Sequence, residues 1–224
     1  MKINKLLFLI AVLASPLFFS CEKDDLKQDV PRDEPFDETW GEGDSVPLVA
    51  RHYFRGKIDS EVVVLQDSIR NYISLFSSIR YGICGGDSAV EFMGFGTVLR
   101  PEAENRNSIE IQFLSCVPDS ATPEERAATI YQGAYPFGST EIGARQNGVL
   151  VIWTDSDGNQ WKSRPSTGAL NNYRFQLTEP LTDEDASYGS EYYIEGVVDL
   201  DLFYGSQSIR LERGEFRLKM SDFE

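Results

Sequence analysis

The sequence is poor in residues that bind metals or act as general bases. It contains one histidine and three cysteines among 224 residues, with no clustered ligand spacing. Transition-metal sites are built from such clusters, so we predict no metal site and no cofactor. Basic residues are also scarce, with 21 Lys and Arg against 36 Asp and Glu and a net charge of −15. This charge repels phosphates, so nucleic acid is not predicted as a partner, and we attribute it to solubility.

Catalytic patterns are missing as well. The single histidine, His52, has no serine or cysteine nucleophile near it and lies in an expected strand. The DSDGN run at residues 155–159 resembles the start of a calcium loop. The acidic ligand that an EF-hand needs at its twelfth position is absent, because Pro165 and Ser166 stand there. Glycosidases use a pair of carboxylates. In a chain with 36 acidic residues such pairs arise by chance, so they do not indicate an enzyme. We therefore predict that the protein is not an enzyme.

Only one long apolar run is present, and it lies at the start of the chain. Lys2 and Lys5 precede a 14-residue stretch, Leu6–Phe19. A membrane-spanning helix needs about 20 apolar residues, so residues 1–20 are predicted to be a cleaved signal peptide. The run ends in Ser20 and Cys21 without an Ala-x-Ala cleavage pattern.

The end of this run, Phe18-Phe19-Ser20-Cys21, resembles a bacterial lipobox. Phe18 and Phe19 depart from the usual Leu and small residue, a relaxation that lipoproteins of Bacteroidota share. The resemblance implies a thioether-linked lipid with palmitate-type acyl chains on Cys21, and several chains would hold the protein in a membrane. The alternative is a signal that is uncleaved or conventionally cleaved, with an incidental cysteine.

The residues after Cys21 give a second resemblance. Lys23-Asp24-Asp25 is similar to the Bacteroidota signal that moves lipoproteins to the outer face of the outer membrane. It implies a lipid-anchored, surface-exposed protein, whereas a plain hydrophilic linker is the alternative. Glu22–Asp44 contains ten acidic and three basic residues, a composition typical of disorder. We therefore predict a flexible tether over 21–45 and a domain over 46–224. Phe36 and Trp40 are expected either to dock on the domain or to form a recognition patch.

Two cysteines remain after Cys21, namely Cys84 and Cys116. In an exported chain such a pair is predicted to form a disulfide. The alternative is two free thiols buried as small hydrophobic residues.

The body of the chain has a β pattern, in which short runs rich in Val, Ile, Phe and Tyr alternate with Gly, Asn, Asp and Pro. The predicted strands are Leu48–Ile58, Val62–Gln66, Tyr72–Ser78, Ala89–Leu99, Ser108–Ser115, Gly133–Phe137, Gly148–Thr154, Gln160–Arg164, Asn172–Thr178, Tyr192–Tyr204 and Ser208–Lys219. Over Asn71–Ile79 the apolar spacing is also near-helical. A bulge or bend is expected at Gly196 and a bulge at Gly214, and a hairpin loop is expected at residues 155–159. A short helix with a capping box is predicted from Thr122 to about Ala128.

These patterns predict an all-β fold, either an antiparallel β-sandwich or a partly closed barrel, with one short helix. The ordered series of segments from FRGKID at 54–59 through GVLVIW at 148–153 to GEFRL at 214–218 resembles small Bacteroidota lipoproteins of uncharacterised function. The resemblance implies a single antiparallel β domain after the tether and brings no catalytic residues.

Two tryptophans are the best candidates for a binding site. Trp153 and Trp161 flank the 155–159 loop and would share a face if their strands pair. We expect either a ligand platform or packing in the core or at its rim. The sequence thus predicts a non-enzymatic outer-membrane lipoprotein that acts as a binding or envelope-interaction module with a protein or glycan ligand. The alternative is an accessory glycan-binding lipoprotein of a polysaccharide-uptake system.

Overall fold

A computed structural model describes residues 48–165, 173–179, 182–183, 191–221 and 223. The predicted signal peptide, the lipidation site Cys21, the export residues Lys23, Asp24 and Asp25, and the tether with Phe36 and Trp40 lie outside the described residues. Within the described ranges, no helix has the length and apolar character needed to cross a membrane.

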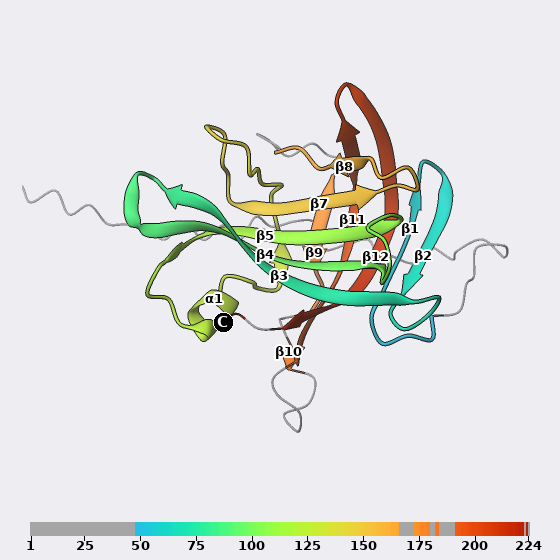
Figure 1. Ribbon diagram of the computed structural model, residues 1–224, viewed down its shortest axis with the longest axis horizontal. Helices are drawn as coiled ribbons and strands as arrows, with labels where there is room; N and C mark the ends of the chain where they lie inside the picture. Colours follow the sequence, from blue (N-terminus) through green and yellow to red (C-terminus); the bar gives the residue numbers. More distant parts are fainter. Residues whose placement is uncertain (1–47, 166–172, 180–181, 184–190, 222, 224) are drawn as a thin grey trace, which may run out of the picture. The chain divides into compact units, whose positions relative to one another are not determined.

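The domain is built almost entirely from antiparallel strands (Figure 1). The strands are β1 (Tyr53–Ile58), β2 (Glu61–Gln66), β3 (Tyr72–Cys84), β4 (Asp87–Pro101), β5 (Ser108–Pro118), β6 (Gly133–Ala134), β7 (Gly148–Thr154), β8 (Gln160–Lys162), β9 (Arg174–Leu177), β10 (Thr182–Asp183), β11 (Glu191–Tyr204) and β12 (Gln207–Ser221). They form one sheet in the order β2-β1-β12-β11-β8-β7-β5-β4-β3, and β9 and β10 also pair with β11.

The sheet curls into a half-barrel, which confirms the all-β prediction and selects the partly closed barrel. The long hairpin of β11 and β12 turns at Gly205 and Ser206. A bulge in β12 shifts its register against both neighbouring strands, between Val198 and Leu200 of β11 and between Arg55 and Lys57 of β1. A bulge increases local strand bending, so this one bends the sheet on both sides of β12.

The bulge predicted in β12 is present, whereas β11 has no bulge at Gly196. Arg213, next to Gly214, has φ 52° and lies in the bulge. Gly196 instead stays in register, opposite Phe216 on one side and Leu177 on the other. A Cβ there would collide with the Gln176 carbonyl oxygen and would lie 2.7 Å from the Phe216 ring. Glycine is therefore needed at 196 for close strand packing.

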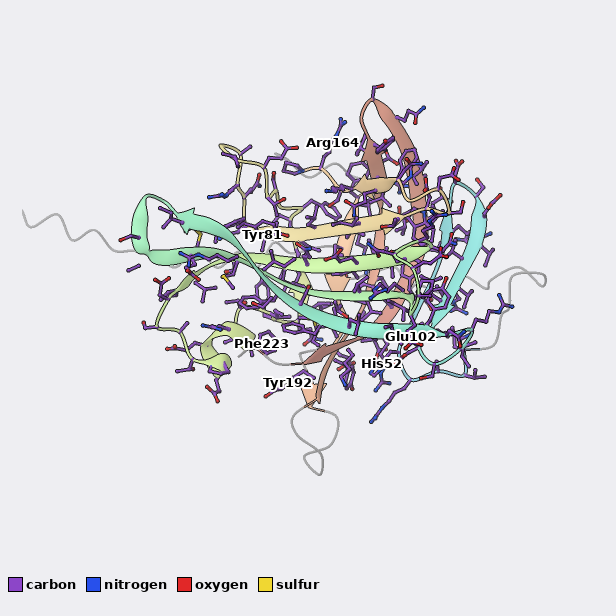
Figure 2. All side chains as sticks on the ribbon, viewed as in Figure 1. His52, Tyr81, Glu102, Arg164, Tyr192 and Phe223 are labelled. Carbon is purple, nitrogen blue, oxygen red and sulfur yellow. A yellow bond between two sulfur atoms is a disulfide. The ribbon has the colours of Figure 1, made fainter. Side chains whose placement is uncertain are left out.

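Helix α1 (Pro123–Ala127) follows β5 and has the predicted capping box. Thr122 Oγ1 accepts from the Glu125 backbone N–H, and the Glu125 carboxylate accepts from the Thr122 N–H at 2.8 Å. The Arg126 guanidinium donates to the backbone oxygen of Phe223 at 3.1 Å. The Phe223 ring lies within ring-contact distance of Phe76, Phe95 and Tyr192, so the end of the described chain packs on the core near α1 (Figure 2).

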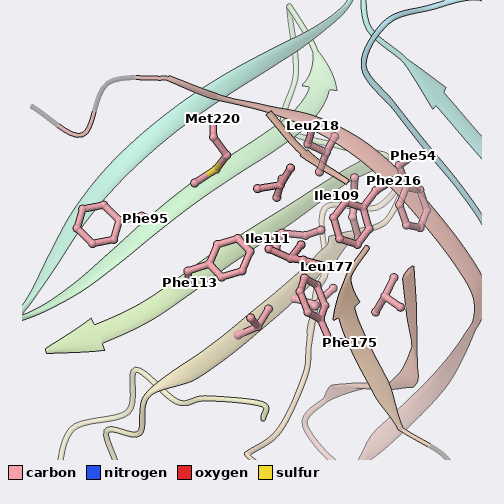
Figure 3. Close-up of a cluster of buried hydrophobic side chains, with 14 of the residues drawn as sticks. Phe54, Phe95, Ile109, Ile111, Phe113, Phe175, Leu177, Phe216, Leu218 and Met220 are labelled. Carbon is pink, nitrogen blue, oxygen red and sulfur yellow. The ribbon is translucent and has the colours of Figure 1, made fainter. Parts of the chain in front are cut away.

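The main core fills the concave side of the sheet. Figure 3 shows side chains from opposite strands meeting there, with aromatic rings at the centre. The Phe175 ring stacks on Phe216 at 5.4 Å and meets Phe113 edge-on at 5.9 Å. A smaller apolar cluster, Phe92, Leu114, Leu150 and Ile152, is separate from the main core.

Some predicted strand bounds were wrong. Residues 48–52 are not a strand, because the Gln66 side-chain oxygen accepts the Val49 and Ala50 N–H groups and takes the place of ladder bonds. The strand predicted over Gly133–Phe137 is limited to Gly133–Ala134, since Pro136 has no N–H to donate. The near-helical spacing of Asn71–Ile79 lies mostly in β3, which runs on to Cys84.

Candidate functional site

The hairpin loop between β7 and β8 is organised around one carboxylate. Asp155 Oδ1 accepts the backbone N–H groups of Asp157 (2.9 Å) and Asn159 (2.8 Å). Its Oδ2 accepts the Asn159 side-chain amide at 3.0 Å and the Trp161 indole N–H at 2.9 Å. Gly158 adopts φ 87°, as the hairpin prediction required.

The surroundings of the Asp155 carboxyl group shift its pKa. Partial burial raises its pKa, but the hydrogen bonds from Trp161, from Asn159 and from the loop backbone outweigh that effect. The pKa of Asp155 therefore lies below its ordinary value, and the charged form is the one that the loop stabilises.

The two candidate tryptophans pair directly across this hairpin. Trp153 of β7 opposes Trp161 of β8, so the two side chains lie on one face of the sheet. Trp153 is 6% exposed and belongs to the core. Trp161 is half-buried, and its ring lies 5.6 Å from that of Tyr204 at the end of β11. The hairpin therefore presents one core tryptophan and one accessible tryptophan rather than an exposed pair.

Both tryptophans line an open pocket of about 420 Å³ between the β7–β8 hairpin and the β1–β2 hairpin. Besides the tryptophans, its apolar wall includes Ile58 of β1, Val63 and Leu65 of β2, and Ile209 of β12. Figure 1 shows β1 and β2 curling toward the ends of β7 and β5 at this side of the sheet. Mouths of β-barrels are common ligand sites, and this pocket has that location and size.

The rim of the pocket is polar. Asp59, Glu61, Asn107, Asp155 and Ser156 line it. Asp59 and Ser60 have φ 51° and 70° and form the two-residue turn of the β1–β2 hairpin, a geometry that type I′ turns require. Asn107, just before β5, also has a positive φ of 48°. Tight turns thus fix these rim residues beside the pocket.

The structure places the other sequence candidates away from this pocket. His52 is buried, and its Nδ1 lies 3.4 Å from Asp67 Oδ2 beside the start of β1. Cys84 and Cys116 come together at disulfide distance, with Cα atoms 5.8 Å apart. In the described ranges no three or more His, Cys, Asp or Glu side chains are grouped in a way that could hold a metal ion.

Comparison with known proteins found no matching family model, no matching curated protein and no matching solved structure.

Proposed function

We propose that this protein is a non-enzymatic, lipid-anchored binding module of the outer membrane, whose β domain holds its ligand in the pocket beside Trp161. The observation that supports the proposal is the pocket itself. An apolar wall, an accessible aromatic ring and a polar rim converge between the β1–β2 and β7–β8 hairpins. This combination is typical of binding sites that orient a ligand with a few polar contacts.

The chemistry of the rim favours binding over catalysis. The Asp155 carboxylate accepts four hydrogen bonds from the loop and from Trp161, so it acts as a positioning group for the indole ring. A general base needs free hydrogen-bonding reach toward a substrate proton, and Asp155 is committed to the loop.

A glycan-binding lipoprotein of a polysaccharide-uptake system is the second candidate function. The half-buried Trp161 ring in the pocket supports it, because sugar-binding sites pack aromatic faces on pyranose rings. The acceptor oxygens of Asp59, Asn107 and Ser156 would serve the sugar hydroxyl groups.

The Trp161→Ala variant tests the role of the pocket. We expect wild-type protein to retain a ligand on a glycan array or in affinity gels, and the variant to lose at least about tenfold in affinity, because stacking and apolar contact are removed. Tyr131→Ala is the matched control, since Tyr131 is an exposed aromatic residue (51%) outside the pocket. If no glycan binds to the wild type, the glycan candidate is rejected. If a ligand binds equally well to Trp161→Ala, the pocket is not its site.

A further inference from the structure

The charge on the pocket rim has a consequence for the class of ligand. Resting on the function proposed above, we propose that the pocket selects a small organic cation, namely an amine whose aromatic or aliphatic body packs on the apolar wall. The residues that define this preference are Asp59 and Glu61 of the β1–β2 hairpin.

Glu61 is an exposed residue at the start of β2. It lies opposite Ile58 in the β1–β2 ladder, and directly opposed residues point to the same face of a sheet. Ile58 is 6% exposed and belongs to the core. Glu61 thus places a carboxylate on the concave face at the mouth of the barrel, next to the apolar wall formed by Val63 and Leu65.

Asp59 adds a second carboxylate two residues away, at the tip of the same hairpin. Its backbone N–H is bonded to the Arg210 oxygen at 2.8 Å, which fixes the turn. Neither Asp59 nor Glu61 has a side-chain hydrogen bond or ion pair within the described part of the chain. The third carboxylate of the rim, Asp155, is already engaged by its loop.

No basic residue lines the pocket within the described ranges. Four basic residues adjoin lining residues in sequence, namely Lys57, Arg106, Lys162 and Arg210. The Arg106 guanidinium donates to the backbone oxygen of the lining residue Ser156 at 3.4 Å and lies 3.7 Å from the Glu104 carboxylate. Arg210 follows Ile209, side chains alternate along a strand, and Arg210 forms ion pairs with Asp199 and Asp201 on the opposite face. An anionic ligand would therefore meet the carboxylates of Asp59 and Glu61, which no ion pair in the described part of the chain neutralises, whereas a cation would be attracted by both.

The protein's own acidic segment is a poor occupant for the same reason. Glu22–Asp44 has ten acidic and three basic residues, and like charges would repel it from Asp59 and Glu61. The net charge of −15 likewise favours the approach of cations from solution. An external cation with an apolar body would pack on the apolar wall and be attracted by the carboxylates of the rim. The Trp161 ring adds a surface for cation–π contact.

Three probes with one phenyl ring and different charge test the inference. We would titrate the full-length protein with phenethylamine, 2-phenylethanol and 3-phenylpropionate, and follow tryptophan fluorescence and heat of binding. We expect phenethylamine to bind about three- to tenfold more tightly than 2-phenylethanol, since exposed ion pairs contribute modestly, and 3-phenylpropionate to bind most weakly. The preference should shrink as salt is raised.

The Asp59→Asn, Glu61→Gln double variant should bind phenethylamine and 2-phenylethanol equally while keeping its affinity for the alcohol. Glu141→Gln is the control, because Glu141 is an exposed acid outside the pocket. If all three probes bind equally well to the wild type and none binds to Trp161→Ala, the charge preference is wrong but the pocket is still the binding site. Absence of binding by every probe would overturn the preference too, and the glycan array decides separately whether the proposed function also fails.

Discussion

At the scale of single residues, Asp155 connects loop structure to the binding wall. Its carboxylate holds the β7–β8 loop and the Trp161 indole together. We expect Asp155→Ala to lower the free energy of unfolding by about 1–2 kcal/mol at neutral pH, because several hydrogen bonds to a charged acceptor are lost. Urea unfolding followed by tryptophan fluorescence would measure it, with Asp157→Ala as the control in the same loop.

The same carboxyl group predicts a pH dependence. Its pKa is lowered in the folded protein, so its contribution to stability is present above the unfolded-state pKa of about 3.9. That contribution is lost as the pH falls through the lower, folded-state pKa. The stability difference between wild type and Asp155→Asn should therefore shrink below about pH 4. A difference that stays constant from pH 7 to pH 3 would show that the charge of Asp155 does not contribute.

Gly196 predicts a steric limit in the centre of the sheet. In Gly196→Ala the new Cβ would meet the Gln176 backbone oxygen and the Phe216 ring, neither of which moves without disturbing a strand. We expect a loss of about 1–3 kcal/mol, the usual range for overpacking, measured by urea unfolding. An unchanged free energy of unfolding in Gly196→Ala would contradict the steric explanation.

At the scale of elements, local patterns were the most predictable. Strand β7 has the predicted bounds, Gly148–Thr154, and the Trp153–Trp161 pairing follows from the hairpin between them. The capping box of α1 was predicted because Thr122, Pro123 and Glu125 are neighbours in sequence. The two-residue strand β10 was not predicted, because so short a segment is defined only by its pairing with Tyr192 and Tyr193 of β11.

The other wall of the pocket shows what sequence patterns could not predict. Val63 and Leu65 of β2 line one pocket with Trp153 and Trp161 only because β1 pairs with β12, where Phe54 lies opposite Phe216 in the ladder. Such long-range pairing depends on how the whole sheet curls, which no local spacing encodes. Sequence analysis therefore identified the tryptophans and missed Asp59, Glu61 and Asn107, whose common location is a tertiary property.

The Cys84–Cys116 pair belongs to the element scale, because it links the end of β3 to β5. The two residues are 32 positions apart, and a bridge closing such a loop is expected to stabilise by about 3–4 kcal/mol. We expect the Cys84→Ser, Cys116→Ser double variant to unfold at lower urea concentration by that free energy, and reductant to lower the wild type to the same level. Alkylation without reductant should leave the mass of the wild type unchanged at both cysteines. Two alkylated thiols would show that no bridge forms.

At the scale of the whole molecule, we propose that a lipid attaches the protein to the membrane and that the β domain binds the ligand. A lipid on Cys21 would attach the protein to the membrane through several acyl chains, so the domain needs no membrane-binding surface. The acidic chain is also repelled by anionic head groups. We therefore expect the pocket beside Trp161 to bind a ligand other than a lipid surface.

The location of the domain is the last prediction, and it is tested on intact cells. We expect proteinase K to degrade the wild-type protein, because Lys23-Asp24-Asp25 is proposed to direct it to the outer face. The variant with three alanines at 23–25 should stay in the membrane fraction and become protected, since it would keep its lipid and lose its export signal. The Cys21→Ala variant separates the two steps, because without a lipid the protein should leave the membrane fraction. Protection of the wild type would refute surface display. Retention of Cys21→Ala in the membrane would refute lipid anchoring, because the attachment would then be made by another part of the chain.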